Sequence, residues 1–150
     1  MKPLKSKYIH PITLKAALEV ASNLRSEDFR EISEGHGLDP LTYLAAMSTD
    51  PATVYFTSPS GKAAGMAGVG KKGDIWMLCT NVIHEQPTLF ARQAKRYVDS
   101  RTEPLLWNIV DSRNEAHLRL LKFLGFKFLR KLKYGPNNVT FIEFCRVFRR

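Results

Sequence analysis

The chain has 150 residues, of which 44% are hydrophobic and 25% are charged. This composition excludes an intrinsically disordered chain, and the length suits one core that needs neither disulfides nor a structural metal ion. We therefore expect a single domain over residues 1–150. Cys79 and Cys145 lie in apolar runs and form no CxxC pair, which predicts buried, reduced thiols.

The positive charge is concentrated towards the C-terminal end. The formal net charge is +9, and residues 113–150 contain ten Lys and Arg side chains against Glu115 and Glu143. Such a field favours an anionic partner: a phosphorylated cofactor, nucleic acid or an acidic protein surface, with a simple solvated face as the alternative. No signal-peptide core or membrane-length apolar run is present, so we expect a cytoplasmic protein with no membrane partner.

The first third of the sequence predicts three helices. Apolar residues recur at helical spacing over 13–24, and Ser26 is a candidate N-cap for a second helix that ends near Gly35. A third short helix is expected over 40–47, with Pro40 in the first turn, where proline is tolerated.

The middle of the chain predicts a meander followed by a crossover. Short runs over 53–57, 62–70 and 74–80 are separated by Ser, Pro, Gly and Lys clusters typical of turns, which indicates three antiparallel strands. An amphipathic helix is expected over 87–100 and a buried strand over 105–110. The strand at 105–110 would pair in parallel with the preceding strand, because the helix serves as a crossover.

The C-terminal part predicts a helix and a hairpin. Ser112 and Glu115 have the spacing of a capping box, and the helix that they begin ends at Gly125. Two strands are expected over 126–134 and 139–148, joined by a Gly-Pro-Asn-Asn turn.

Several familiar catalytic motifs are broken or missing. Gly65, Gly70 and Lys71 approach a P-loop, but Lys72 replaces the magnesium-binding Ser or Thr and a strand follows. The four histidines form no i,i+4 pair and have no carboxylate at ligand spacing, and no serine lies in a GxSxG elbow. We therefore expect no metal site, nucleotide-hydrolysis site or serine-hydrolase site.

The segment 106–128, LWNIVDSRNEAHLRLLKFLGFKF, resembles a motif of the GNAT (Gcn5-related N-acetyltransferase) superfamily. In that motif a strand is followed by an asparagine, a short helix and Leu-Gly-Phe. The matching positions are Asn114, Leu120, Leu124, Gly125 and Phe126. The element order over 13–148 fits the same fold. The resemblance implies an α/β protein with a mixed, mostly antiparallel sheet, a central parallel strand pair and flanking helices.

The resemblance also implies a cofactor site. In the superfamily the two central strands splay apart, and acetyl-CoA or another acyl-CoA lies in the gap. The implied cofactor-binding residues are Leu78, Cys79 and Thr80 on the earlier strand, Gln86 and Thr88 at the start of the next helix, and Asn114 after the other strand. A helix N-terminus suits phosphate because it offers N–H donors and a positive dipole end. For Asn114 the alternative is a local hydrogen bond at the helix start.

Two departures from the superfamily pattern leave catalysis open. The usual glycine-containing pyrophosphate loop is replaced by residues 82–88, which contain no glycine and include Pro87. The tyrosine that protonates the departing thiolate in many members is replaced by Leu121, which has no proton to donate. Candidate catalytic replacements are His84, Glu85 and His117, because histidine and glutamate can exchange protons near neutral pH.

A narrower resemblance connects the segment containing Trp107, Asn108, Asn114 and His117 to small GNAT-like internal virion or capsid-assembly proteins of T7-like tailed phages. We favour a phage-type GNAT-fold protein whose catalysis is open. One hypothesis is an acetyl-CoA-dependent N-acyltransferase of an unknown amine. The alternative is a non-catalytic protein that binds phage or host proteins in the bacterial host cytoplasm or the virion. Nucleic-acid binding through the basic C-terminal quarter ranks last, because charge alone supports it.

Overall fold

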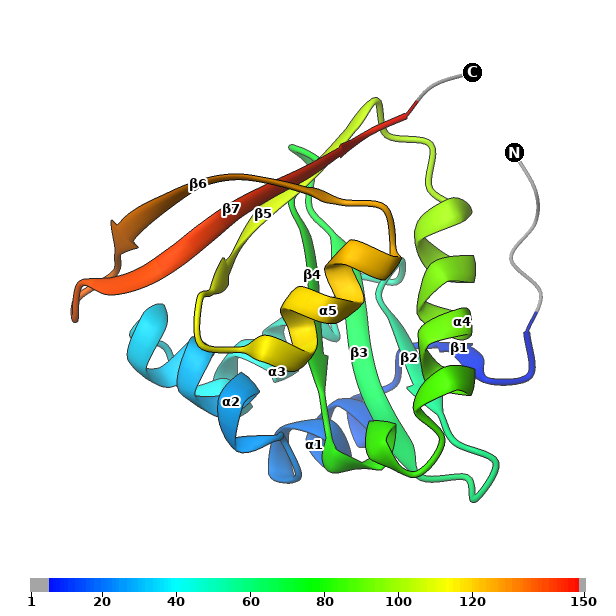
Figure 1. Cartoon of the computed structure of the whole chain (residues 1–150). Coiled ribbons are helices and arrows are strands. Elements are labelled where there is room, and N and C mark those ends of the chain that lie inside the picture. Colours follow the sequence, from blue (N-terminus) through cyan, green and yellow to red (C-terminus); the bar gives the residue numbers. More distant parts are fainter. Residues whose placement is uncertain (1–5, 149–150) are drawn as a thin grey trace.

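The computed structural model describes residues 6–148, which form two sheets flanked by helices (Figure 1). The strand orders are β1-β2-β3-β4 and β5-β7-β6, and every pairing within a sheet is antiparallel. The strands are β1 (Ile9–Pro11), β2 (Val54–Thr57), β3 (Ala63–Val69), β4 (Ile75–Cys79), β5 (Leu105–Asp111), β6 (Lys127–Tyr134) and β7 (Val139–Val147). A parallel bridge between Asp74 and Trp107 connects the sheets, so the predicted parallel pair is present as neighbours that diverge.

Helices cover both faces of this arrangement. The helical elements are α1 (Leu14–Ser22), α2 (Ser26–Arg30), the π-helical turn η1 (Glu31–Gly35), α3 (Pro40–Met47), the 3-10 turn η2 (Asn81–His84), α4 (Pro87–Asp99) and α5 (Glu115–Phe123). Helices α4 and α5 lie on one side of β3 and β4, and α1 to α3 lie on the other (Figure 1). Among residues 6–148, no helix is long and apolar enough to cross a membrane.

Each face has its own apolar core. On the α4 side, Phe90, Ala94 and Tyr97 pack with Ile75 and Cys79 of β4. This confirms the predicted amphipathic helix, because its buried residues recur at helical spacing: Phe90, Gln93, Ala94, Tyr97 and Val98. On the opposite side, the core contains Ala17 and Val20 of α1, Leu44 of α3, Met66 of β3 and Leu78 of β4.

The helix starts agree with the sequence analysis at α1 and α3 and contradict it at α2 and α5. Thr13 and Asp39 cap α1 and α3 through their side chains, and Pro40 occupies the first turn of α3 as expected. Ser26, however, is the first residue of α2 and donates its hydroxyl to Glu27 (2.8 Å), so it is not the N-cap. Arg25 holds that position without a side-chain capping bond, and its side chain is buried.

The predicted capping box at the start of α5 is also wrong. The helix begins at Glu115, and Ser112 donates its backbone N–H to Thr140 on β7 (3.0 Å). Asn114 occupies the N-cap position but makes no side-chain capping bond, because its amide points into the interior. The end of the helix agrees with prediction, since Gly125 adopts a φ of +89°, which favours glycine.

Three further features differ from the sequence analysis or extend it. Strand β1 was not expected, because three residues that include a proline carry no periodic signal. The β6–β7 hairpin was expected, but its register shifts between Phe128 and Lys131. Both cysteines are free as predicted, although Cys145 is only half-buried whereas Cys79 is buried.

Candidate functional site

Strands β4 and β5 are joined at one end of their length. Asp74 forms the parallel bridge with Trp107, and the Trp107 N–H donates to the Gly73 carbonyl (3.1 Å). One residue further, Asn108 donates its side-chain amide to the Ile75 carbonyl (2.8 Å) in place of a backbone bond. This substitution of a side chain for a ladder bond begins the separation of the two strands.

The other end of β4 is capped by the α1–α2 connection. The Cys79 N–H donates to the Asp28 carboxylate (2.6 Å), and the Arg25 N–H donates to the Cys79 carbonyl (3.0 Å). Because a strand alternates its backbone groups, Ile75, Met77 and Cys79 direct theirs to the same edge. Within residues 6–148, no group of β5 pairs with the Met77 backbone, which is therefore the open position of this edge.

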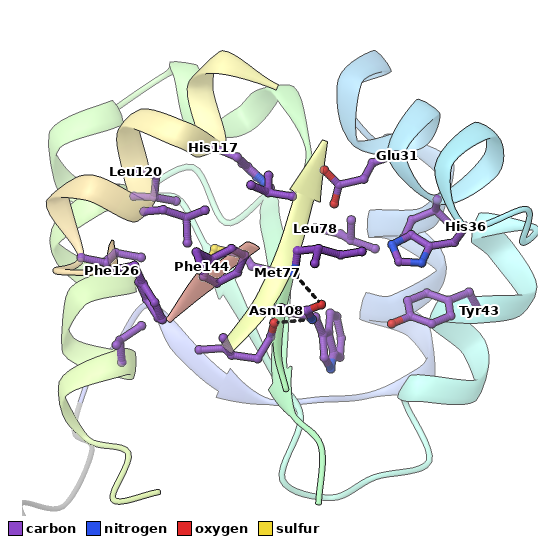
Figure 2. A pocket seen from close by; sticks show the side chains of 18 residues that line it. Glu31, His36, Tyr43, Met77, Leu78, Asn108, His117, Leu120, Phe126 and Phe144 are labelled. Atoms are coloured by element: carbon purple, nitrogen blue, oxygen red, sulfur yellow. Dashed lines mark hydrogen bonds between the residues drawn. The ribbon is translucent and has the colours of Figure 1, made fainter. Parts of the chain in front are cut away.

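A cavity of about 90 Å³ lies at this gap, and its walls come from both cores. Ile32 and Leu78 belong to the core under α1 to α3, whereas Val98, Leu124 and Phe126 belong to the core under α4 and α5. Figure 2 shows Leu120, Phe126 and Phe144 on one side of β5, and Glu31, His36 and Tyr43 on the other. The cavity therefore takes its lining from both sides of the gap between β4 and β5.

Glu31 is the acidic group of this cavity. Its carboxylate accepts the Asp111 N–H (2.9 Å), and the residue is only 8% exposed. Burial raises the pKa of Glu31 to about 8, with smaller contributions from the nearby Asp28 and Asp111 charges. The residue begins the π-helical turn η1, a rare conformation that is frequent at functional sites. A buried carboxyl that titrates near neutral pH in a cavity is a candidate acid–base group.

A buried polar network lies beside this cavity. Arg25 donates to Asp28 (3.0 Å), and Asn114 donates to the same carboxylate oxygen (2.9 Å). Arg25 also donates to the side-chain oxygen Oδ1 of Asn114 (3.4 Å), and all three residues are almost completely buried. Asn114, predicted to contact a cofactor, therefore connects α5 to α2 in this structure.

His117 lines the cavity from α5. Its Nε2 atom lies 3.5 Å from the Asp28 carboxylate and, within residues 6–148, has no hydrogen-bond partner although it is buried. Leu121, one helical turn further, lines the same cavity. A buried ring nitrogen without a hydrogen-bond partner is costly, and Nε2 has only the longer contact with Asp28 to offset that cost. His117 is the one of the three predicted catalytic residues that lines this cavity.

The other two predicted catalytic residues lie outside the cavity. His84 ends the η2 turn and is exposed, and Glu85 forms an exposed ion pair with Lys62 (3.7 Å). Gln86 and Thr88, predicted to bind phosphate, are exposed at the start of α4. The structure therefore separates these four residues from His117 and Glu31.

The predicted cofactor-binding residues of β4 are already engaged. The Thr80 N–H donates to the Ala64 carbonyl (2.9 Å), and Leu78 pairs with Met66 across the ladder. The backbone of Cys79 is bonded to Asp28 and Arg25, as described above. The open backbone edge lies instead at Met77.

Among residues 6–148, one group of potential metal ligands is present. A ligand atom from each of Asp28, Cys79 and His117 lies within 4.8 Å of the others. The Arg25 guanidinium bonded to Asp28 disfavours a cation there. Burial, with a further contribution from Asp28, raises the pKa of the Cys79 thiol well above its usual value, which disfavours the thiolate that binds metals.

Sequence reasoning missed the residues that shape this site most. Met77 carries no local motif, because its importance lies in the divergence of β4 from β5. Glu31 and Asp28 lie on helices with an ordinary charge pattern, and neither periodicity nor motif indicates that they are buried. The one available signal was the acidic run Glu27, Asp28 and Glu31 interspersed with arginines near the predicted core.

No protein-family model matches this sequence, and no curated protein is significantly similar to it. Solved structures, however, are similar over the whole chain. A GNAT-family acetyltransferase from Streptococcus agalactiae has a TM-score of 0.73 at 10% identity, covering 99% of this chain and 100% of that one. A GNAT-family acetyltransferase from Bacillus anthracis has a TM-score of 0.69 at 9% identity, covering 96% and 97%.

A third similar structure was solved with a ligand. YncA from Salmonella typhimurium, with its cofactor acetyl-CoA, has a TM-score of 0.65 at 13% identity, covering 97% of this chain and 96% of that one. At such identities the similarity establishes the fold. The chain has the fold of GNAT acetyltransferases, as its sequence predicted.

Proposed function

We propose that this protein is an acetyl-CoA-dependent N-acyltransferase with an atypical site. The observation that carries the proposal is the cavity at the gap between β4 and β5, with the Met77 backbone at its open edge. This edge suits the amide-containing pantetheine arm of an acyl-CoA, because amides need backbone partners in an apolar cavity. The structures similar to this chain include an acetyltransferase-fold protein solved with acetyl-CoA.

The residues of the cavity supply the proton transfers that amide formation needs. When bound, acetyl-CoA provides an activated thioester carbonyl. Glu31 accepts the proton of the attacking amine as the C–N bond forms, and because its pKa is about 8 it becomes ionised, and thus able to act as a base, as the pH rises towards 8. His117, which lines the cavity, would supply the proton that the departing thiolate needs. It thereby replaces the tyrosine missing at Leu121, one turn away on the same helix face.

The η2 turn and the start of α4 suit the pyrophosphate of acetyl-CoA less well than the cavity suits the pantetheine arm. The N–H groups of Val82, Ile83 and Glu85 are bonded within the η2 turn or to Thr80. Gln86 and Thr88 remain predicted contacts for the pyrophosphate, and Asn114 remains a predicted contact only if the buried network rearranges. Contacts from Leu78, Cys79 and Thr80 stay predictions too, and for Cys79 the Asp28 carboxylate would have to leave.

Because the N–H groups of the η2 turn are already bonded, a second function is also favoured. In this alternative the protein keeps the fold but binds other proteins without catalysis. A phage origin, with phage or host proteins as partners, remains a prediction based on the resemblance of residues 107–125. Nucleic acid as a partner of the basic C-terminal quarter is likewise a prediction from charge.

Calorimetric titration with acetyl-CoA and coenzyme A tests the proposal. The Leu121→Trp variant fills the cavity, and the matched control Leu129→Trp places the same side chain on exposed β6. We expect micromolar binding to the wild type and control, and at least tenfold weaker binding to Leu121→Trp. Absence of wild-type binding at millimolar ligand contradicts the enzyme proposal and favours the binding protein.

Measurement of kcat distinguishes the proposed role of His117 from that of the exposed His84. His117→Gln should lower kcat by about a hundredfold or more, the usual contribution of a general acid. The control His84→Gln changes an exposed residue and should leave kcat unchanged. Equal effects of the two substitutions contradict the role of His117.

A further inference from the structure

The cavity has two chemically different ends. On the α4 and α5 side its walls are aliphatic or phenyl groups, including Leu120, Leu124 and Phe126. On the α2 and α3 side the lining includes three half-buried aromatic rings, those of His36, Tyr43 and Trp76. His36 and Tyr43 of this aromatic end come from η1 to α3, before β2, whereas Trp76 comes from β4.

The aromatic rings form an ordered wall. Tyr43 and Trp76 contact edge to face, with centroids 6.2 Å apart and planes at 71°. Figure 2 shows Tyr43 and His36 on the same side of the cavity as Glu31. Aromatic rings bind other rings and, through their faces, cations. This end of the cavity therefore suits a ligand that combines a ring with one positive charge.

Only one carboxyl in the cavity lining is available to a cation. Of the described residues that line it, Glu31 alone is acidic. The neighbouring Asp28 carboxylate is bonded to Arg25, Asn114 and the Cys79 N–H. A ligand with a single ammonium group matches this arrangement.

The neighbouring charges act against a ligand with several positive charges. Asp111, the other buried acid, is paired with Arg113, which also contacts the exposed Glu34 (3.1 Å). The whole chain carries a net charge of +9, which repels polycations from the site. A linear polyamine or a peptide rich in lysine would meet this repulsion without a second carboxylate to offset it.

We propose that the acceptor is a small arylalkyl monoamine, whose ring lies against Tyr43 and Trp76 and whose ammonium group lies beside Glu31. The inference rests on the proposed function for its reaction. The ammonium group gives one proton to the Glu31 carboxylate, and the resulting neutral nitrogen bonds to the acetyl carbon as the C–S bond breaks. The thiolate takes a proton from His117, and the second proton lost by the nitrogen replaces it on His117. The products are an N-acetyl arylalkylamine and coenzyme A.

Binding of the amine can be measured without the cofactor. Calorimetric titration at pH 8.5 compares 2-phenylethylamine with n-hexylamine, which has the same charge without a ring, and with spermidine. We expect 2-phenylethylamine to bind at least tenfold more tightly than either. Equal affinity for hexylamine, or a preference for spermidine, overturns the inference.

Substitutions at Tyr43 test whether the amine binds at the aromatic end of the cavity. Tyr43→Leu should weaken 2-phenylethylamine binding about tenfold, whereas Tyr43→Phe, which keeps the ring, should bind like the wild type. Equal binding by the Leu and Phe variants contradicts a site at Tyr43, and thermal unfolding of both variants shows whether the fold is kept.

The two proposals fail in different ways. Coenzyme A binding together with a preference for spermidine overturns the acceptor class and leaves the transferase standing. Binding of 2-phenylethylamine that depends on the Tyr43 ring, without coenzyme A binding, overturns the transferase and supports the aromatic amine site.

Discussion

The two ends of the path that a coenzyme A molecule would follow are built differently. At the cavity, β4 leaves β5 and the backbone of Met77 faces an apolar space. At the loop before α4, the 3-10 turn η2 uses the N–H groups of Val82, Ile83 and Glu85 internally. The contrast teaches that two strands of this fold can remain apart at the cavity while the N–H groups of the loop before α4 are bonded within a 3-10 turn.

The largest expected effect is on stability, and it concerns the buried Arg25–Asp28 pair beside the Cys79 end of β4. Asp28→Ala removes the main charged partner of the buried Arg25 and should cost about 3–5 kcal/mol of unfolding free energy. The control Glu27→Ala removes the partly exposed partner and should cost less than about 1 kcal/mol. Urea unfolding measures both. Similar losses in the two variants would show that the network does not close the gap.

Glu31 should make stability depend on pH. Burial raises its pKa from 4.5 to about 8, so between these values the unfolded chain has released a proton that the folded chain keeps. The unfolding free energy therefore falls as pH rises through this window, by an amount on the order of 5 kcal/mol.

Glu31→Gln should remove that fall, whereas Glu34→Gln, at an exposed position, should retain it. Chemical unfolding at pH 5, 6.5 and 8 measures the slope. A wild-type slope that survives in Glu31→Gln would assign the pH dependence to other groups.

Because the N–H groups of the η2 turn are already bonded within the chain, we expect the phosphates of acetyl-CoA to contribute little to its affinity. S-acetylpantetheine, which lacks the phosphates and the nucleotide, should bind within about tenfold of acetyl-CoA, or about 1.4 kcal/mol. Calorimetry of the wild type makes the comparison directly. A loss of a thousandfold would show that the loop or α4 opens to hold the pyrophosphate, and would remove the contrast between the two ends.

The smallest effect is expected at the loop surface. Glu85→Gln breaks an exposed ion pair with Lys62, so its unfolding free energy should change by less than about 1 kcal/mol, and acetyl-CoA affinity should not change. Thermal unfolding and calorimetry of this variant provide the measurement. A large loss of affinity would place Glu85 in the cofactor site despite its position outside the cavity.

The sequence predicted the fold well because its signals are local. The helix ending at Gly125, the amphipathic face of α4 and the strand meander each arise from spacing or turn chemistry. The start of α5 was misjudged because Asn114 forms long-range bonds with Arg25 and Asp28 that override a local capping pattern.

The candidate site was less predictable than the fold. Among the residues proposed from the sequence as catalytic, only His117 lines the cavity, whereas His84 and Glu85 are exposed. Glu31 and Met77 could not be found, because burial of an acid and divergence of two strands depend on segments far apart in the chain. Prediction failed where tertiary contacts decide the chemistry.

The positive charge at the C-terminal end has a consequence for solubility. Strand β6 is the outer strand of its sheet, and most of its residues are exposed. Its sequence includes Lys127, Arg130, Lys131 and Lys133, and its register shifts midway. Charged side chains and bulges on an outer strand prevent edge-to-edge pairing between molecules. The basic C-terminal quarter therefore also protects the most exposed strand of this protein from aggregation.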